Sequence, residues 1–416
     1  MTGRYKKSII AAVGMLYMIK KYNPKPMAIV DFQLFLLKKI KAAEAGLKKC
    51  KGVTHQLRLE KSNDRPSKER SKAIDEELKA ISTKKEKYNF IIYIWRCFGD
   101  GIVFSFCDKY AIKHLLYDRK YREKETAGFI SGKDGLKNEL YLIKEAASND
   151  VPAVLCDLTN TLRHGDVCLL GVSDPYPIEV KSSPKINERG ERQIRNIAQI
   201  NQFFKTDRAE NFRNQGVTLR IEHIGREKNH LKKINDCIGR SYTEGTSRIK
   251  PEQGICYIAI TDFKEEILDV QGKYIHAISL NDYKNKMQWH PYTPFTTLLN
   301  PEHIFNFIDG RLIIIILLDL QIIKNRYKKS GMNIRFLNDG TWYAQITESG
   351  DILKGGFRVS EQSFLRLAFE FQSLTWLIKQ HKKELGTFTQ AFEDAAEGLL
   401  KEIPKDWFDI EDGIPD

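Results

Sequence analysis

The first 98 residues constrain the fold most, because they read as almost uninterrupted helix. Pro24 and Pro26 end a first helix, and a second helix is expected over residues 27–59. Residues 62–67 form a polar turn with the chemistry of a helix start, and a third helix rich in Lys and Glu is expected over 68–98. Two long charged helices joined by a short turn predict a helical hairpin or arm.

Positive charge is concentrated in two parts of the chain. Residues 1–99 contain 23 Lys and Arg against 9 Asp and Glu, and residues 181–250 contain 16 against 8. Residues 100–180 and 251–416 are mildly acidic. This distribution favours a polyanionic partner, because contacts of Lys and Arg with phosphate supply most non-specific affinity for nucleic acid. A solvated helical face and a membrane-surface arm are the alternative interpretations.

The cysteine pattern and the N-terminus bear on the cellular compartment. The seven cysteines are scattered and include no CxxC pair, which favours reduced thiols in a cytoplasmic protein. Residues 8–19 are apolar and follow two lysines, as in a signal peptide, but two more lysines come next and no small-residue cleavage site is present. The stretch is too short to span a bilayer, so a buried or partner-facing helix is expected, with no membrane partner.

From about residue 130 the pattern changes to mixed helix and strand. The expected elements in this region are a helix at 133–148, strands at 153–163, 166–172 and 176–181, a helix at 187–204, and strands at 217–224 and 255–261. The last part is expected to contain a strand at 312–318, a hairpin at 342–356 and a helix at 361–382.

The predicted fold class is therefore α/β, in four parts. They are a basic helical arm at 1–99, a connector at 100–129, a core at 130–265 and an α+β domain of unknown role at 280–416.

The strongest chemical signal comes from two strands that carry two carboxylates and a lysine. Glu179 and Lys181 lie two apart on one strand, so both project from the same face. If residues 172–175 form a four-residue connection, Asp166 lies across from Lys181 on that face, whereas a three-residue connection places it on the other. Carboxylates this close need a cation, and oxygen ligands suit Mg²⁺ or Mn²⁺. Phosphodiester hydrolysis uses such a metal ion together with a nearby cation.

Glu139 adds a further carboxylate. In its helix it lies on the apolar stripe formed by Leu136, Leu140, Ile143 and Ala146. A carboxylate on an apolar face is costly unless it has a partner, and a metal cluster at the edge of the sheet would provide one. The alternative is an ordinary helical glutamate.

These residues together resemble the PD-(D/E)XK phosphodiesterase superfamily, whose members have the restriction-endonuclease-like fold. The resemblance rests on the helix with Glu139, on Asp166 after a glycine rather than a proline, on Glu179-Val-Lys181 and on the basic helix that follows, over about residues 130–262. It implies a mixed sheet flanked by helices. It also implies that Asp166 and Glu179 bind Mg²⁺ (or Mn²⁺), that Lys181 positions or activates water, and that Glu139 is an accessory ligand.

The resemblance also implies that the basic helix presents polar residues to the site. Gln193 is the candidate for a residue that faces the metal, and Arg189, Arg192 and Gln199 are candidate DNA contacts. A solvated polar face is the alternative interpretation of these residues.

Two other segments resemble motifs of phosphate chemistry, one an acidic triplet and the other a phosphate-binding loop. Asp262-Phe-Lys264 ends a predicted strand, but no Asp on a paired strand precedes it. Residues 127–134 look like a phosphate loop but lack its first glycine and the Ser or Thr after Lys133, so the phosphate-loop interpretation is rejected.

The sequence therefore predicts a magnesium-dependent endonuclease that acts on DNA, with RNA as the alternative substrate. By analogy of architecture, we expect a prokaryotic restriction or anti-phage defence protein that forms a homo-oligomer or binds a partner defence protein. The alternative from another class is a nucleic-acid-binding or scaffold protein with an inactive nuclease fold.

Overall fold

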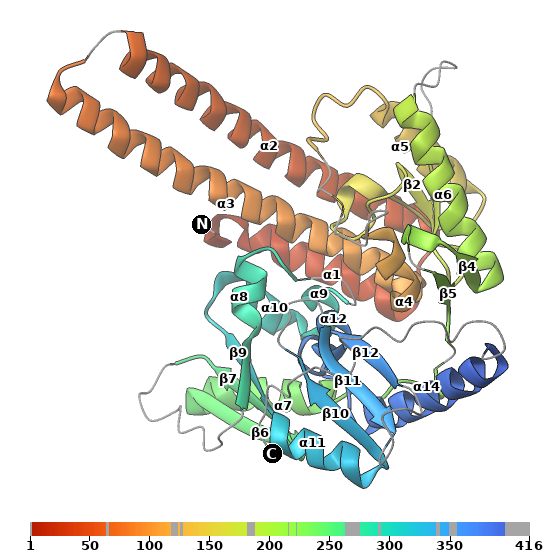
Figure 1. The fold of residues 1–416 in the computed structure, drawn as a ribbon. Helices are drawn as coiled ribbons and strands as arrows, with labels where there is room; N and C mark the ends of the chain where they lie inside the picture. The colour runs from red at the N-terminus through yellow and green to blue at the C-terminus, as the bar shows by residue number, and fades with distance from the viewer. Residues whose placement is uncertain are drawn as a thin grey trace. The chain divides into compact units, whose positions relative to one another are not determined.

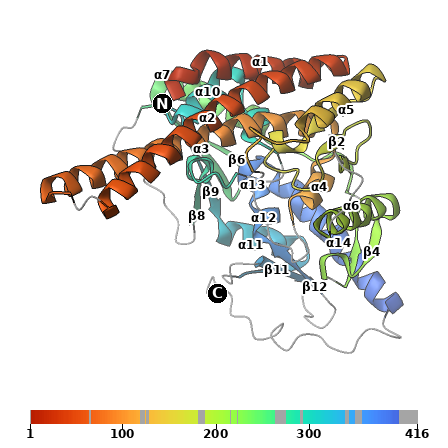
Figure 2. The same ribbon diagram turned by 90° about the horizontal axis from the view of Figure 1, so that it is seen from above.

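The computed structural model describes residues 2–63, 66–117, 124, 128–180, 188–214, 216–221, 223–262, 275–289, 293–337, 342–348 and 356–395. The chain mixes helices with small antiparallel sheets (Figures 1 and 2), which confirms the α/β class in this broad sense. It divides into two compact units. Unit 1 comprises Met1–Arg220 and Lys284–Asp309, and unit 2 comprises Ile221–Tyr283 and Gly310–Asp416.

Two long helices that pack along each other, α2 (Pro26–Asn63) and α3 (Lys68–Phe106), form the frame of unit 1. Ser67 caps α3 by accepting the backbone N–H of Arg70, so the predicted turn and helix start are confirmed. The outer halves of these helices project together as a hairpin (Figure 1). The other helices of the unit are α1 (Lys6–Tyr22), α4 (Lys109–Ile112), α5 (Leu136–Ser148), α6 (Glu188–Thr206), α9 (Phe295–Leu298) and α10 (Pro301–Asp309).

The inner halves of α2 and α3 belong to the core of unit 1 and are not a separate arm. Gln33 is fully buried beside β1 (Ala153–Leu155), where its amide donates to the Ala153 carbonyl and accepts the Leu155 N–H, both at 2.8 Å. Asp100, 2% exposed, accepts the backbone N–H groups of residues 160 and 161. Strand β1 and the loop at residues 160–161 are thus each held by a buried polar side chain from one of the long helices.

The sheet of unit 1 has the strand order β1-β2-β3 and is antiparallel, with β2 at Val167–Leu169 and β3 at Tyr176–Ile178. Helix α5 packs against β1 and β2, and α6 packs against β3. The predicted chain order of helix, three strands and helix is therefore confirmed. The strands are shorter than expected, because the chain turns into a 3-10 helix (Cys156–Leu158) directly after β1.

The connection between β2 and β3 is longer than expected. Val167 pairs with Ile178, so the connection covers residues 170–175 instead of four residues. The pairing of the two strands is therefore shifted by two residues from the predicted register. Within this connection, the Arg220 guanidinium binds the Asp174 carboxylate through two hydrogen bonds of 2.9 Å.

The strands expected after α6 join other sheets. Strands β4 (Arg208–Glu210) and β5 (Val217–Leu219) form a two-stranded sheet of their own. Strand β7 (Ile255–Ile260) pairs with β6 (Thr246–Glu252) and β9 (Ile313–Asp319) in unit 2. The compact unit that holds β1–β3 thus ends at residue 220 in this part of the chain, and not near 265. An apolar run predicts a buried strand, but the sheet that it joins depends on distant segments.

Unit 2 contains two antiparallel sheets. The first has the order β6-β7-β9-β8, with β8 at Ile275–Ser279, and α7 (Leu231–Glu244) packs against β6 and β7. The second has the order β10-β11-β12, at Met332–Phe336, Trp342–Glu348 and Gly356–Ser360. The remaining helices are α8 (Leu280–Asn285), which begins in this unit, α11 (Leu320–Lys329), α12 (Glu361–Phe364), α13 (Arg366–Phe369) and α14 (Leu374–Ala395).

Of the three elements predicted after residue 280, two are confirmed. The buried strand at 312–318 and the hairpin at 342–356 are confirmed by β9 and by β11 with β12. The single helix predicted at 361–382 is wrong. The chain forms α12, α13 and α14 instead, and Phe371, between the last two, has a left-handed φ of 53° that interrupts the helix.

No helix in the described ranges combines the length and the hydropathy that a bilayer crossing needs. Helix α1 buries one face, with Ile9, Val13 and Leu16 at 4% exposure or less, as expected for a packed helix. All seven cysteines lie among the described residues and are buried, and each has a free thiol.

Gln33 provides a test of the role of α2 in the core. Gln33→Leu removes both partners of the β1 backbone and leaves a buried N–H and a buried C=O unsatisfied. Each such group costs about 1–3 kcal/mol, so the free energy of unfolding should fall by at least about 2 kcal/mol in a denaturant titration. The matched control is Gln56→Leu on the exposed side of the same helix, which should change little. Equal stability of the two variants would contradict this account.

Candidate functional site

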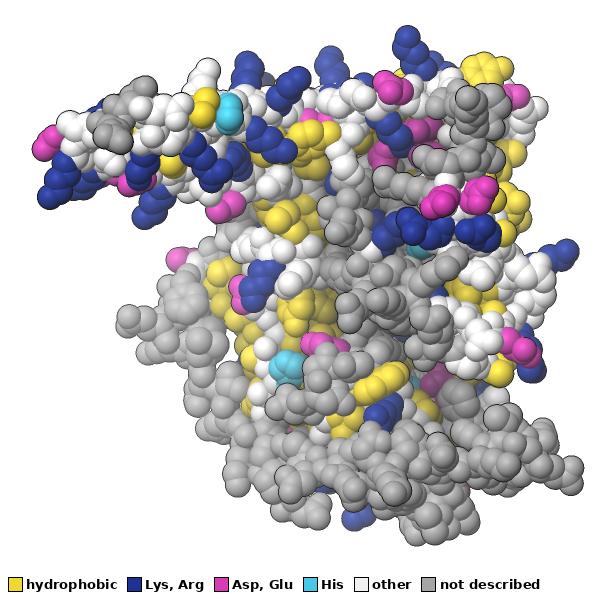
Figure 3. Space-filling view, turned by 45° about the horizontal axis from the view of Figure 1, so that its top comes forward, with side chains coloured by type: hydrophobic (Ala, Val, Ile, Leu, Met, Phe, Trp, Pro, Cys, Tyr) yellow, Lys and Arg dark blue, Asp and Glu magenta, His cyan; other side chains and the backbone are white. Residues whose placement is uncertain are grey.

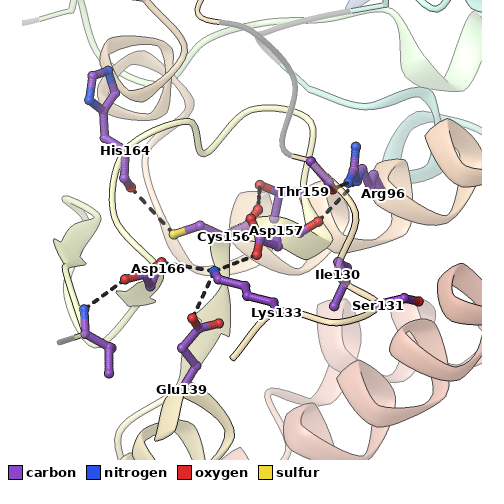
Figure 4. Close-up of polar contacts among 12 residues, drawn as sticks. Arg96, Ile130, Ser131, Lys133, Glu139, Cys156, Asp157, Thr159, His164 and Asp166 are labelled. Atoms are coloured by element: carbon purple, nitrogen blue, oxygen red, sulfur yellow. Dashed lines mark hydrogen bonds and ion pairs between the residues drawn. The ribbon is translucent and has the colours of Figure 1, made fainter. Parts of the chain in front are cut away.

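Three carboxylates converge on the ammonium group of Lys133 (Figure 4). The Lys133 Nζ lies 2.8 Å from Asp157 Oδ2, 2.9 Å from Glu139 Oε1 and 3.0 Å from Asp166 Oδ1. The three acids come from different elements: the first turn of α5, the 3-10 helix after β1, and the residue before β2. One positive charge therefore balances three acidic groups, and we call these four residues the carboxylate cluster.

Glu139 is the most deeply buried acid of the cluster. It lies on the buried face of α5, as predicted, and is 1% exposed. Its Oε2 atom is buried and has no hydrogen-bond partner within the described part of the chain. Burial raises the pKa of Glu139, and the Lys133 ammonium offsets only part of that rise. A buried carboxylate oxygen without a partner is costly, so a proton or a further cation at this position would stabilise it.

Asp166 is held in place by the strand that carries Glu179. Its backbone N–H donates to the Ile178 carbonyl at 2.8 Å, and its Oδ2 accepts the Val180 N–H at 2.9 Å. These two contacts place Asp166 beside residues 178–180, the segment that contains Glu179. Because the difference from the predicted register is two residues, Asp166 stays on the predicted face of the sheet.

Gly165 permits this close approach of the two strands. Its φ is +81°, and a Cβ atom built there would lie 2.9 Å from the Ile178 carbonyl oxygen. Any other residue would therefore push β2 from β3 and strain the backbone. This geometry accounts for the glycine before Asp166.

Of the remaining predicted site residues, the structure describes Glu179 and Gln193 but not Lys181 or the side chain of Arg189. Glu179 is half-buried and lies between the two residues that bind Asp166. Lys181 lies outside the described residues, as does the side chain of Arg189, so their roles stay predictions. Gln193 is half-buried and lies one turn before the buried Ile197, on the face of α6 that packs inward.

The other two candidate contacts, Arg192 and Gln199, are exposed on α6. Exposure is required of a DNA contact but is also what a solvated face shows.

Lys133 and Asp157 were missed by the sequence interpretation. Asp157 fell inside the strand predicted over 153–163, and Lys133 was considered only as part of a phosphate loop. Asp157 directly follows β1, and a polar residue at a strand end was the signal that could have identified it. Burial alone would lower the pKa of Lys133, but the carboxylates of Asp157, Glu139 and Asp166 outweigh it and raise that pKa.

The long helices hold the loops that carry these two residues. Glu44 of α2 accepts the N–H groups of Ile130 and Ser131, both at 2.8 Å, just before Lys133. Arg96 of α3 donates from Nε to the Asp157 carbonyl at 3.1 Å (Figure 4). Buried polar side chains of the hairpin thus set the distance between the ammonium and its carboxylates.

A metal ion bound at the carboxylate cluster would have to displace the Lys133 ammonium from at least one carboxylate. Within the described ranges, no group of three or more His, Cys, Asp or Glu side chains forms a ready metal cage. The Lys133 ammonium lies where the three carboxylate oxygens converge. Carboxylates in this number suit a hard divalent cation, and binding one requires the ammonium to leave at least one of them.

Lys133→Met tests whether the cluster needs a cation. The variant leaves three acids without their shared counter-charge, so the melting temperature should fall in EDTA. The cost should be about 2 kcal/mol, between that of an exposed pair and a fully buried one, because Lys133 is 28% exposed. Addition of Mg²⁺ or Mn²⁺ should recover part of the loss. Lys137→Met, an exposed change on α5, is the control. A Lys133→Met protein that melts like wild type and ignores divalent ions would contradict a cation-dependent cluster.

Comparison of the chain with protein-family models, with curated proteins and with solved structures finds no match. The carboxylate cluster and its surroundings are therefore the basis for any statement about function.

Proposed function

We propose that this chain is a divalent-metal-dependent nuclease that hydrolyses phosphodiester bonds of DNA, with unit 1 as its catalytic part. The observation that carries the proposal is the convergence of Glu139, Asp157 and Asp166, with Glu179 in the segment beside Asp166. These acids come from α5 and from the ends of the three antiparallel strands: Asp157 lies just after β1, Asp166 just before β2 and Glu179 just after β3. A restriction-endonuclease-like core would have its acids in this order.

The chemistry of the cluster fits a divalent ion. The buried Oε2 of Glu139 has no partner among the described residues, and one ammonium serves three acids. Asp166 and Glu179 would hold Mg²⁺ or Mn²⁺, with Glu139 as an accessory ligand and Asp157 as a further neighbour. When bound, such an ion supplies polarisation of a phosphate oxygen and a more acidic water.

The chain's own groups have separate tasks in this proposal. The backbone N–H of Val180 orients the Asp166 carboxylate, which fixes the position of the acidic face relative to β3. Lys181, one residue further on, would place a positive charge beside the attacked phosphate. Lys133 keeps the acids together when no divalent ion is present.

The same geometry also favours a second candidate, a nucleic-acid-binding or scaffold protein with a structural acidic cluster. Its support is the Lys133 ammonium, which already satisfies one oxygen of each of three acids. In that case the cluster would stabilise unit 1 and have no part in chemistry. Cleavage assays on variants separate the two candidates.

Alanine at Asp166 or Glu179 should abolish cleavage of plasmid and linear DNA in Mg²⁺ or Mn²⁺. Each acid supplies negative charge to one divalent ion, so neither alone suffices. Binding of DNA should survive or tighten, because the repulsion of phosphate is relieved. Glu139→Ala should be milder and partly restored by Mn²⁺. The control is Asp262→Ala, which alters a similar acidic triplet in unit 2. Loss of activity in the control but not in Glu179→Ala would show that the wrong strand was chosen.

Lys181→Ala separates metal binding from turnover. The variant should bind Mn²⁺ as wild type does in a calorimetric titration, because the lysine is not a ligand. The cleavage rate should fall by about 10²-fold or more, since a positive charge at the developing negative charge acts in the transition state. A variant with normal turnover would remove Lys181 from the mechanism. Parallel assays on duplex DNA, single strands and RNA identify the substrate.

We also propose a role in prokaryotic restriction or anti-phage defence, which rests on the joining of a nuclease unit to a second unit of mixed strands and helices. Expression of the wild-type chain in a bacterial host should then slow growth or reduce phage yield, and Lys181→Ala should relieve both effects. Toxicity that persists in Lys181→Ala would exclude nuclease activity as its cause.

A further inference from the structure

One face of α2 carries a row of basic residues on the projecting hairpin. Lys48, Lys51, His55 and Arg58 follow Glu44 at steps of four, three, four and three residues, so all lie on one stripe of the helix. These four side chains are exposed. From Lys48 to Arg58 the stripe extends about 15 Å along the helix. Figure 3 shows the concentration of Lys and Arg on the hairpin.

Within the described part of the chain, no ion pair joins the lysines and the arginine of this stripe to an acid. Among the described residues, the ion pairs of the outer hairpin join Lys61 to Asp75 and Arg70 to two glutamates. None of the described pairs involves Lys48, Lys51 or Arg58. These positive charges are therefore free to meet a polyanion.

The stripe contacts an exposed aromatic ring, that of Phe129, which lies four residues before Lys133 of the carboxylate cluster. The Lys51 ammonium lies 4.6 Å from the ring centroid of Phe129, and Phe129 is 45% exposed. Glu44, at the inner end of the stripe, binds the backbone of the next two residues, Ile130 and Ser131. Lys133 of the cluster follows two residues later. Basic stripe, aromatic ring and cluster are thus joined by one fixed loop.

We propose that the stripe and Phe129 bind a single-stranded segment of nucleic acid and lead it to the carboxylate cluster. Proteins that bind single strands combine a row of cations for the phosphates with aromatic rings on which unpaired bases stack. Phe129 under Lys51 provides such a ring, which the paired bases of a duplex could not use. An anionic membrane fits less well, because the apolar face of α2 is buried in unit 1 and is not available for insertion.

The delivery of the strand to the cluster rests on the proposed function, but binding does not. Binding is therefore measured in EDTA, without cleavage, by the fluorescence anisotropy of labelled oligothymidylate and of a labelled duplex. Phe129→Ala should weaken binding of the single strand about tenfold and leave duplex binding almost unchanged. Tyr141→Ala, which removes a ring that is 68% exposed on α5, is the control and should have no effect.

The charge of the stripe is tested separately. A triple change of Lys48, Lys51 and Arg58 to Gln should reduce the slope of log affinity against log salt by about 2, because up to three phosphate contacts are lost. The control removes equal charge from the other helix of the hairpin, with Lys68, Lys72 and Lys79 changed to Gln. Its slope should stay close to that of wild type.

Several outcomes would overturn the inference. They are an equal loss in both triple variants, an equal effect of Phe129→Ala on single and double strands, and tighter binding to phosphatidylserine vesicles than to oligothymidylate. Wild-type protein that binds the single strand through Phe129 but never cleaves it would overturn the nuclease proposal and leave this inference standing. If the wild-type protein cleaves DNA and Phe129→Ala binds the single strand normally, this inference is overturned and the nuclease proposal stands.

Discussion

The shared ion pairing of Lys133 is the interaction on which the candidate site depends. Its ammonium contacts one carboxylate from α5, one from the turn after β1 and one from the start of β2, each within 3.0 Å. Without a cation at this point, acids from three elements would repel one another across the middle of unit 1. The deeply buried Glu139, whose pKa is raised by burial, shows that one ammonium satisfies the cluster only in part.

The long helices make this pairing possible, because they position the loops that carry the charged groups. Glu44 fixes the loop before Lys133, Arg96 fixes Asp157, and Gln33 completes the edge of β1. Each is a buried polar side chain whose partners are backbone groups that would otherwise be unsatisfied. Removal of the whole N-terminal region would therefore disrupt the site itself, and only the outer part of the hairpin is free for a separate binding role.

Local features of the structure were predictable from the sequence where local chemistry decides them. Pro26 and the Ser67 cap mark the starts of the two long helices, although both helices end later than expected, at Asn63 and Phe106. The apolar stripe of α5 indicated the burial of Glu139. The pairing register of β2 and β3 was not predictable, because the length of their connection is not set by local sequence alone: Asp174 within it binds Arg220, which is distant in the sequence. The apolar sequence of strand β7 predicts a buried strand but does not say which sheet it joins. Its pairing with β6 and β9 places it in unit 2. The place of Lys133 in the site was not predictable either. Its loop is held by Glu44, and this contact joins residues that are far apart in the sequence.

The central claim is that a divalent ion takes the place of the Lys133 ammonium at the carboxylate cluster. Diffraction from Mn²⁺-soaked crystals at the manganese absorption edge tests it most directly. The account predicts an anomalous peak about 2 Å from carboxylate oxygens of Asp166 and Glu179, with the Lys133 Nζ moved away from at least one acid. Crystals at saturating Mn²⁺ that show no peak there, with Lys133 still bridging all three carboxylates, would contradict it.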